Sequence, residues 1–219
     1  MPALESFGKR MTYAQMGETA RAVTSWLQAQ GFVKGDRIAI MMPNVMAYPP
    51  LLFGALAGGY VVVNVNPLYT PRELTHQLKD SGARALFVLE NFGNTVEETL
   101  KSVKLDKVVL VTPGDLLGFK GKIINFVSRR IKKAVPAFSL PGAVSFSQVL
   151  AQGRGKAPAT VEVTPDDLAF LQYTGGTTGV SKGAMLLHRN VGANVLQIEK
   201  LIGESMAAGM GLPAPPDPA

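Results

Sequence analysis

Short apolar runs alternate with helical periodicities along most of the chain. The runs are uncharged or nearly so, are rich in Val, Ile, Leu and Phe, and are bounded by Gly, Pro, Asn or Asp, as expected of buried strands. Strands that alternate with helices favour a mostly parallel sheet with helices on both faces, the α/β class. The expected strands are 37–42, 60–65, 85–89 and 108–111.

Start and stop signals place the helices between these runs. Thr12 followed by Gln15, and Thr70 followed by Glu73, have the spacing of a capping box, and the second pair brackets a proline that suits the first helical position. Gly82 can end the second helix in a left-handed conformation. The expected helices are about 13–30, 71–81 and 94–103.

The stretch from Ile38 to Pro71 has no charged residue, which raises the question of a membrane span. Prolines and glycines interrupt it repeatedly, so no continuous helix of about 20 residues fits. We expect a strand at Arg37–Met42, a helix at about Val45–Ala57 and a strand at Tyr60–Val65. Such a unit, buried on both faces, is this apolar in proteins that do not span membranes.

Composition narrows the class of protein. The 219 residues are 47% hydrophobic and 17% charged, as in an ordinary α/β protein, and the chain has no cysteine. Disulfides and thiolate metal sites are therefore excluded, and the composition agrees with a reducing compartment. No charged and then apolar leader opens the sequence, so we expect a cytoplasmic location.

The net charge of +6 is concentrated in residues 118–138, which contain no acid. A helix is expected there, with Ile123, Ile124, Val127, Ile131 and Ala134 on one side, most cations on the other, and Phe126 among the cations. It either lies on an anionic membrane surface, as a peripheral contact at the inner face, or forms a solvated outer face of its own domain. Nucleic-acid binding is not expected, because no nucleic-acid recognition motif accompanies the cations. The cations are Lys120, Lys122, Arg129, Arg130, Lys132 and Lys133.

A segment rich in glycines and hydroxyls, with one lysine, follows the apolar run 168–171. Glycines let backbone N–H groups approach an anion closely, hydroxyls add donors, and a lysine reaches the outer phosphates of a nucleotide. The sequence therefore predicts a phosphate-binding loop. Its candidate residues are Tyr173, Thr174, Gly175, Gly176, Thr177, Thr178, Gly179 and Lys182, with Tyr173 at the border of the site.

Two other interpretations of this loop are weaker. It could be only a flexible turn between strands. It could also be a Walker-type loop of a phosphotransferase, but Ser181 stands where that pattern needs glycine, and Gly183 stands where it needs a hydroxyl for magnesium.

The string from Tyr173 to Asn190 resembles the signature loop of the AMP-forming adenylating enzymes, from which it departs mildly at Gly175 and Ser181. The segments Asn64–Leu78 and Met41–Asn44 resemble more narrowly those of bacterial long-chain fatty-acyl-CoA ligases. The resemblance extends from about residue 11 to about residue 197.

The resemblance implies ATP-dependent activation of a long-chain fatty acid to an acyl-adenylate, followed by transfer to coenzyme A, with Mg²⁺ assisting. It also implies an incomplete N-terminal large domain, because segments that would bind adenine and ribose and supply a catalytic lysine are not found in the 219 residues. The chain alone is then expected to be catalytically incomplete, and no acid, base or thiol-transfer residue is nominated. The alternative is a non-catalytic nucleotide-binding or membrane-surface module.

The chain is expected to divide at changes of pattern. His76 and His188 have no second histidine or carboxylate at ligand spacing and are expected to be structural. The last residues are rich in Ala, Gly and Pro, and no regular element is expected there. The expected units are a first α/β unit (1–117), a basic helix and connection (118–166), a second α/β unit with the loop (167–205) and a disordered tail (206–219).

Overall fold

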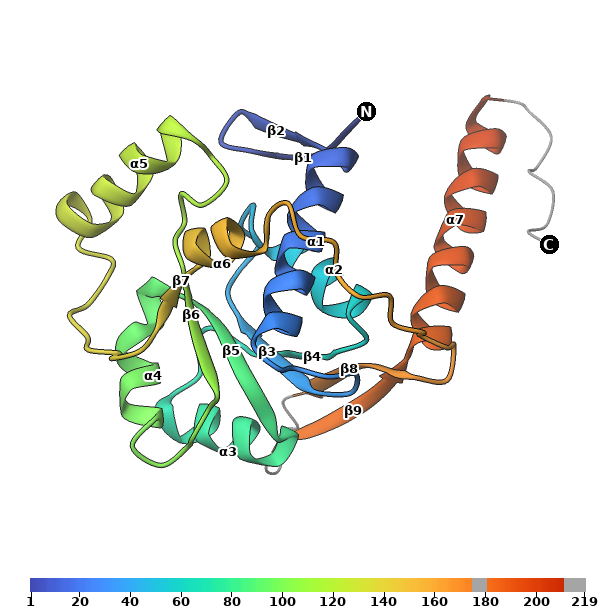
Figure 1. The fold of residues 1–219 in the computed structure, drawn as a ribbon. Helices are drawn as coiled ribbons and strands as arrows, with labels where there is room; N and C mark the ends of the chain where they lie inside the picture. Colours follow the sequence, from blue (N-terminus) through green and yellow to red (C-terminus); the bar gives the residue numbers. More distant parts are fainter. Residues whose placement is uncertain (175–180, 211–219) are drawn as a thin grey trace.

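The computed structural model describes residues 1–174 and 181–210, with side chains through residue 203. Seven strands form one sheet in the order β7-β6-β5-β3-β4-β8-β9, in which β9 runs antiparallel to β8 and the other neighbours pair in parallel. Figure 1 shows the sheet and its helices. The strands are β1 (Pro2–Ser6), β2 (Lys9–Thr12), β3 (Arg37–Met41), β4 (Val61–Asn64), β5 (Ala83–Leu89), β6 (Lys107–Val111), β7 (Val144–Ser145), β8 (Leu168–Thr174) and β9 (Lys182–Leu187).

Helices cover both faces of the sheet, which confirms the expected fold class. One core contains buried residues of α1, α2 and α6, and the other contains buried residues of α3 and α4. Trp26 and Phe87 meet edge to face in the first core, with ring centroids 6.2 Å apart. The helices are α1 (Tyr13–Ala29), α2 (Tyr48–Ala57), α3 (Pro71–Ser81), α4 (Gly93–Thr99), α5 (Phe119–Phe126), α6 (Phe146–Gly153) and α7 (His188–Met210), with a 3₁₀ turn η1 (Glu90–Phe92) and a π turn η2 (Val127–Ile131).

Local capping accounts for the helix boundaries. The Thr12 hydroxyl accepts the N–H of Gln15, and the Gln15 side chain accepts the N–H of Thr12, which confirms the first capping box. The equivalent exchange between Thr70 and Glu73 begins α3. Gly82 ends α3 with φ of 64°, the left-handed conformation that favours glycine.

The uncharged stretch forms β3, α2 and β4, as expected. Helix α2 begins at Tyr48, with prolines in its first turn, where no N–H donor is needed. It starts three residues later than the pattern indicated. Among the described residues, no helix is both long enough and apolar enough to cross a membrane.

The basic segment differs from the expected amphipathic helix. Helix α5 ends at Phe126, and the π turn η2 carries the chain to Ile131. Ile123 and Ile131 are 51% and 66% exposed, whereas Ile124 packs against the cluster of Met11, Met46 and Leu117, so the domain covers the expected apolar side only in part. Small residues also pack here: Gly121 approaches Gly114 so closely that a Cβ on Gly121 would lie 1.9 Å from the Gly114 carbonyl oxygen. The π turn then shifts the register of the following residues.

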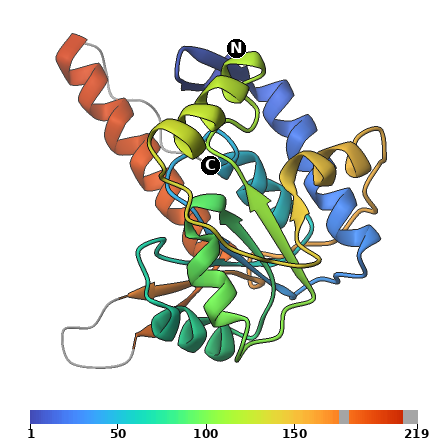
Figure 2. The same cartoon turned by 90° about the vertical axis from the view of Figure 1, so that its left-hand side faces the viewer.

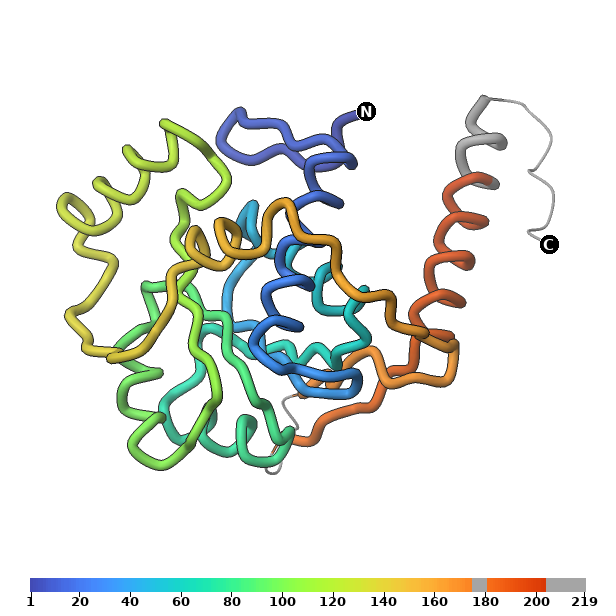
Figure 3. The backbone as a smooth tube through the Cα atoms, in the orientation of Figure 1, coloured from blue at the N-terminus to red at the C-terminus, as the bar shows by residue number. Residues whose placement is uncertain are grey.

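Several elements were not expected from the sequence. The β1–β2 hairpin precedes α1, and the connection 118–166 contributes both β7, which pairs with β6, and α6, which packs on α1. Figure 3 shows the chain then running past α1 toward β8. Helix α7 continues to Met210, so the expectation of no regular element is wrong for residues 206–210; the first proline of that stretch is Pro213. Residues 211–219 lie outside the described part.

Candidate phosphate-binding site

The candidate loop connects β8 to β9, and the structure describes both of its ends. Thr174 is paired opposite Lys182 in the antiparallel ladder, and both residues are exposed. The ladder therefore brings a hydroxyl and an ammonium group to the same end of the hairpin, beside α3 (Figure 2). Gly175, Gly176, Thr177, Thr178 and Gly179 lie outside the described residues.

Tyr173, one residue before the end of β8, has a buried and hydrogen-bonded side chain. Its side chain is 8% exposed and belongs to the core on the α3 side of the sheet. The Tyr173 hydroxyl donates a hydrogen bond of 2.5 Å to Oδ2 of Asp80. Burial, together with the hydrogen bond to Asp80 and its negative charge, raises the pKa of Tyr173 well above its usual value. The phenol therefore stays protonated at neutral pH and anchors β8.

The other end of the loop is tied to the same helix. Nε2 of His76 lies 3.2 Å from the carbonyl oxygen of Ser181, the residue that precedes β9. The sequence indicated a structural role for His76 but gave no partner, and Asp80 was not singled out. The only available signal was their i, i+4 spacing, which places them on one face of α3.

A second polar group lies on the opposite side of the sheet. The Tyr48 hydroxyl donates to Oδ1 of Asn64 at 2.9 Å, and the Asn64 amide donates to Oε1 of Gln172 at 3.0 Å. Asn64 ends β4, and Gln172 is its partner on β8, so this chain spans the carboxyl ends of two parallel strands. Ligands of open α/β sheets bind at such strand ends.

A cavity of about 290 Å³ opens next to this polar chain. The side chain of Tyr48 belongs to both, since it lines the cavity and contacts Asn64. The other lining residues are Leu4, Glu5, Ser6, Asn44, Val45, Met46 and Pro49. Among the described residues, no group of three His, Asp or Glu side chains is placed to hold a metal ion.

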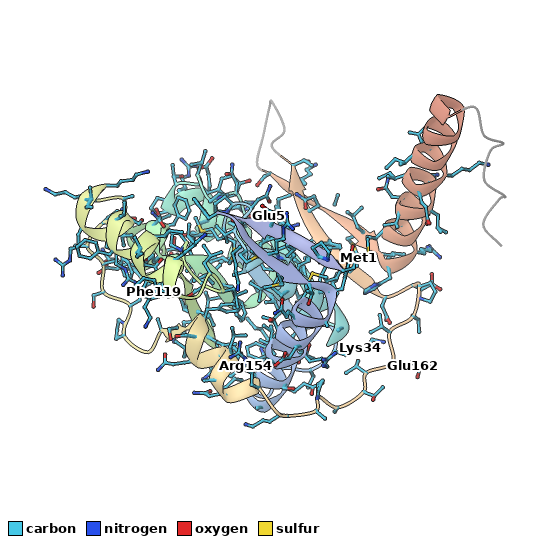
Figure 4. The ribbon with its side chains drawn as sticks, turned by 90° about the horizontal axis from the view of Figure 1, so that it is seen from above. Met1, Glu5, Lys34, Phe119, Arg154 and Glu162 are labelled. Atoms are coloured by element: carbon cyan, nitrogen blue, oxygen red, sulfur yellow. The ribbon has the colours of Figure 1, made fainter. Side chains whose placement is uncertain are left out.

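The cations of residues 118–138 are exposed, together with large apolar side chains. Figure 4 shows α5 at the edge of the molecule, with its outer side chains directed away from the body. One of the six cations is engaged, because Arg129 makes hydrogen bonds of 2.6–3.1 Å to the carboxylate of Glu90, whose side chain is 6% exposed. The exposed apolar residues are Phe119, Ile123, Phe126 and Ile131.

Comparison with known proteins identifies the family of the chain. The family model described as AMP-binding enzyme matches residues 1–212, and the chain belongs to this family. It is 48% identical over 213 residues to a long-chain-fatty-acid–CoA ligase of Salmonella typhimurium. The alignment covers 96% of this chain and 38% of that protein, so the chain spans well under half the length of this curated relative.

Solved structures show the same fold. A long-chain-fatty-acid–CoA ligase from Archaeoglobus fulgidus superposes with a TM-score of 0.67 at 27% identity, over 90% of this chain and 34% of that one. An anthranilate CoA ligase in complex with anthranoyl-AMP superposes with a TM-score of 0.73 at 21% identity, over 92% of this chain and 34% of that one. The second likeness concerns the fold alone.

Proposed function

We propose that this chain contributes the ATP-phosphate-binding part of a long-chain fatty acid–CoA ligase that forms AMP. The observation that carries the proposal is the pairing of Thr174 with Lys182 at the end of the β8–β9 hairpin, in a chain of the AMP-binding family. The curated relative named above supplies the substrate class.

The reaction proceeds in two steps. The fatty carboxylate attacks the α-phosphorus of ATP, giving acyl-adenylate and pyrophosphate; the thiol of coenzyme A then displaces AMP. Negative charge grows on the departing pyrophosphate, and the Lys182 ammonium, the Thr174 hydroxyl and the loop N–H groups at 175–179 stabilise it. No described residue is assigned to thiol transfer, so the chain by itself is expected not to complete the cycle.

Magnesium has no ready-made site of its own in the described residues, which contain no suitable cluster of His, Asp and Glu side chains. Mg²⁺ would instead enter bound to the ATP phosphates, since this ion keeps several waters and binds through substrate phosphates. No step here is attributed to a resident metal.

Nucleotide binding by the purified 219-residue chain tests the proposal. We expect Mg·ATP and pyrophosphate to bind, and Lys182→Ala to weaken binding about 10- to 100-fold, because a charge-assisted hydrogen bond to phosphate is lost. Lys79→Ala, which removes an exposed lysine of α3, is the matched control. Equal affinity of Lys182→Ala and the wild type would contradict the assignment. Acyl-CoA formation by the chain alone would contradict the expectation that the chain does not complete the cycle.

A second candidate function is attachment to an anionic membrane surface through α5 and η2. Exposed Phe and Ile side chains among cations suit the boundary between lipid headgroups and acyl chains. Arg129 is committed to Glu90, so the attraction falls to the remaining five cations, each worth about 1 kcal/mol near an anionic surface. The cytoplasmic, peripheral location follows from this proposal.

Vesicle co-sedimentation tests the membrane contact. We expect binding to phosphatidylserine vesicles that is lost in Phe126→Ser/Ile131→Ser and weakened in Arg130→Glu/Lys132→Glu. Lys104→Glu/Lys156→Glu changes two exposed lysines outside this surface and serves as the charge-matched control for the second variant. Equal binding to neutral phosphatidylcholine vesicles, or no loss in either double variant, would count against the surface.

A further inference from the structure

Two polar side chains one turn apart on α3 contact Tyr173 and Ser181, which lie on either side of the segment 175–180. Asp80 accepts a hydrogen bond of 2.5 Å from the Tyr173 hydroxyl at the end of β8. His76 bonds to the Ser181 carbonyl oxygen just before β9 at 3.2 Å. One helix thus holds both stems of the phosphate-binding loop, and its partners lie 93 and 105 residues away in sequence.

The helix is rigid enough to serve as a support. Leu74 and Leu78 are fully buried in the core, and the capping box fixes the start of α3. Gln77, also fully buried, donates to the Asn64 carbonyl oxygen at 2.8 Å and so ties α3 to the end of β4. The positions of His76 and Asp80 relative to the sheet are therefore fixed by packing.

A loop rich in glycine needs such support. Glycine has the largest conformational freedom of any residue, and ordering a loop around a phosphate costs entropy for each residue fixed. Holding both stems in place reduces that cost and pre-organises the N–H groups for the anion. The Ser181 carbonyl can only accept, so Nε2 of His76 must carry the proton of this hydrogen bond.

We propose that His76 and Asp80 are positioning residues that clamp the stems of the phosphate-binding loop. This inference rests on the proposed function, since it assumes that the loop receives the phosphates of ATP. His76 acts through Ser181 and Asp80 acts through Tyr173; neither is assigned a contact with the reacting atoms.

The test compares four α3 variants and one control in the 219-residue chain. His76→Ala and Asp80→Ala remove the contacts; His76→Gln keeps an N–H donor and Asp80→Asn keeps an acceptor. Lys79→Ala changes an exposed neighbour on the same helix. Hydrogen exchange of peptides covering 170–174 and 181–186 is measured without nucleotide, and Mg·ATP affinity is measured in parallel.

We expect both alanine variants to exchange these peptides about tenfold faster and to weaken Mg·ATP binding about tenfold. The Gln and Asn variants restore most of both properties, and Lys79→Ala matches the wild type. Unchanged exchange at both stems in the folded alanine variants would overturn the clamp. If the wild type itself fails to bind Mg·ATP, the proposed function fails, and the exchange rates alone decide the clamp.

A measurement on the wild type guards against variants that do not fold. The ¹⁵N chemical shifts of the His76 ring report which nitrogen is protonated. A protonated Nε2 at neutral pH supports the hydrogen bond to Ser181, and an unprotonated Nε2 overturns it.

Discussion

At the scale of single residues, the site depends on how closely β9 approaches Tyr173. Gly183 is the ladder partner of Tyr173, and a Cβ built on Gly183 would lie 2.9 Å from the ring. Only glycine leaves room for the buried ring that donates to Asp80. The backbone position of Gly183, next to Lys182, therefore depends on the buried ring of Tyr173.

Gly183→Ala is expected to destabilise the protein by about 1–3 kcal/mol, because the added methyl overlaps a ring that packing holds in place. Gly192→Ala, in a helix with nothing within 4 Å of the added Cβ, should instead stabilise by up to about 1 kcal/mol. Urea unfolding of both variants measures the difference. Equal stabilities would mean that the ring moves aside freely.

Because of Tyr60, we expect the folded protein to lose stability at alkaline pH. Burial, with the negative charge of Asp36, raises the pKa of Tyr60 to about 12. The pKa of tyrosine in the unfolded chain is about 10. The stabilisation from the protonated Tyr60 is therefore complete below pH 10 and is lost as the pH rises toward 12. Tyr60→Phe should flatten the fall in the free energy of unfolding between those pH values, and Tyr13→Phe, which removes an exposed hydroxyl, is the control. An unchanged slope in Tyr60→Phe would refute the linkage.

At the scale of elements, α1 and α2 pack through a glycine. A Cβ on Gly54 would lie 2.6 Å from the Ala20 carbonyl oxygen, and the Thr24 hydroxyl donates to the Gly54 carbonyl at 2.7 Å. The two helix backbones are therefore in close contact on the face of the sheet that carries Tyr48.

Gly54→Ala should separate these helices and destabilise by about 1–3 kcal/mol, even though alanine is the better helix former. Gly17→Ala on α1 meets only the end of the Arg21 side chain at 3.6 Å and is expected to stabilise by about 0.5–1 kcal/mol. Thermal melts of the pair check the signs. A stabilising Gly54→Ala would show that the interface can expand.

The Glu90–Arg129 pair holds η2 to the end of β5. Arg129→Ala leaves a nearly buried carboxylate without its guanidinium, and because Arg129 is itself half exposed, the expected loss is about 1–3 kcal/mol. Hydrogen exchange over residues 119–131 should accelerate in Arg129→Ala and stay unchanged in the neighbouring exposed Arg130→Ala. Similar exchange in both variants would remove the structural role assigned to Arg129.

At the scale of the whole molecule, one sheet joins β3 and β4 to the loop-bearing β8–β9 hairpin, while α7 stands apart from the helices that cover the sheet (Figure 1). Its outer surface carries large apolar side chains that the described residues do not cover. These are Val195, Leu196, Ile198, Leu201 and Ile202.

We therefore expect the 219-residue chain to self-associate at micromolar concentration, because exposed apolar patches of this kind favour association. Leu201→Lys should reduce the association measured by sedimentation velocity. Val33→Lys alters an isolated exposed residue and should not. A wild-type chain that remains monomeric throughout would contradict the expectation.

The sequence alone determined the features that depend on near neighbours. Capping boxes join residues three apart, and buried strands are short apolar runs. The glycines, hydroxyls and lysine of 173–182 are close together in sequence, so a phosphate-binding loop can be predicted without a structure. The fold class and the boundaries of α1 and α3 followed from these local patterns, and the family followed from the resemblance of the strings 173–190, 64–78 and 41–44 to known sequences. The roles of the loop residues remain predictions.

The tertiary structure alone decided the features that depend on distant partners. His76 and Asp80 are assigned a role because they contact Ser181 and Tyr173. No sequence periodicity links those two residues to α3. Gly121 of α5 lies close to Gly114, and a π turn follows the helix; neither feature appears in a helical projection. Contacts between remote segments are fixed by how the layers pack, and packing is a property of the whole chain.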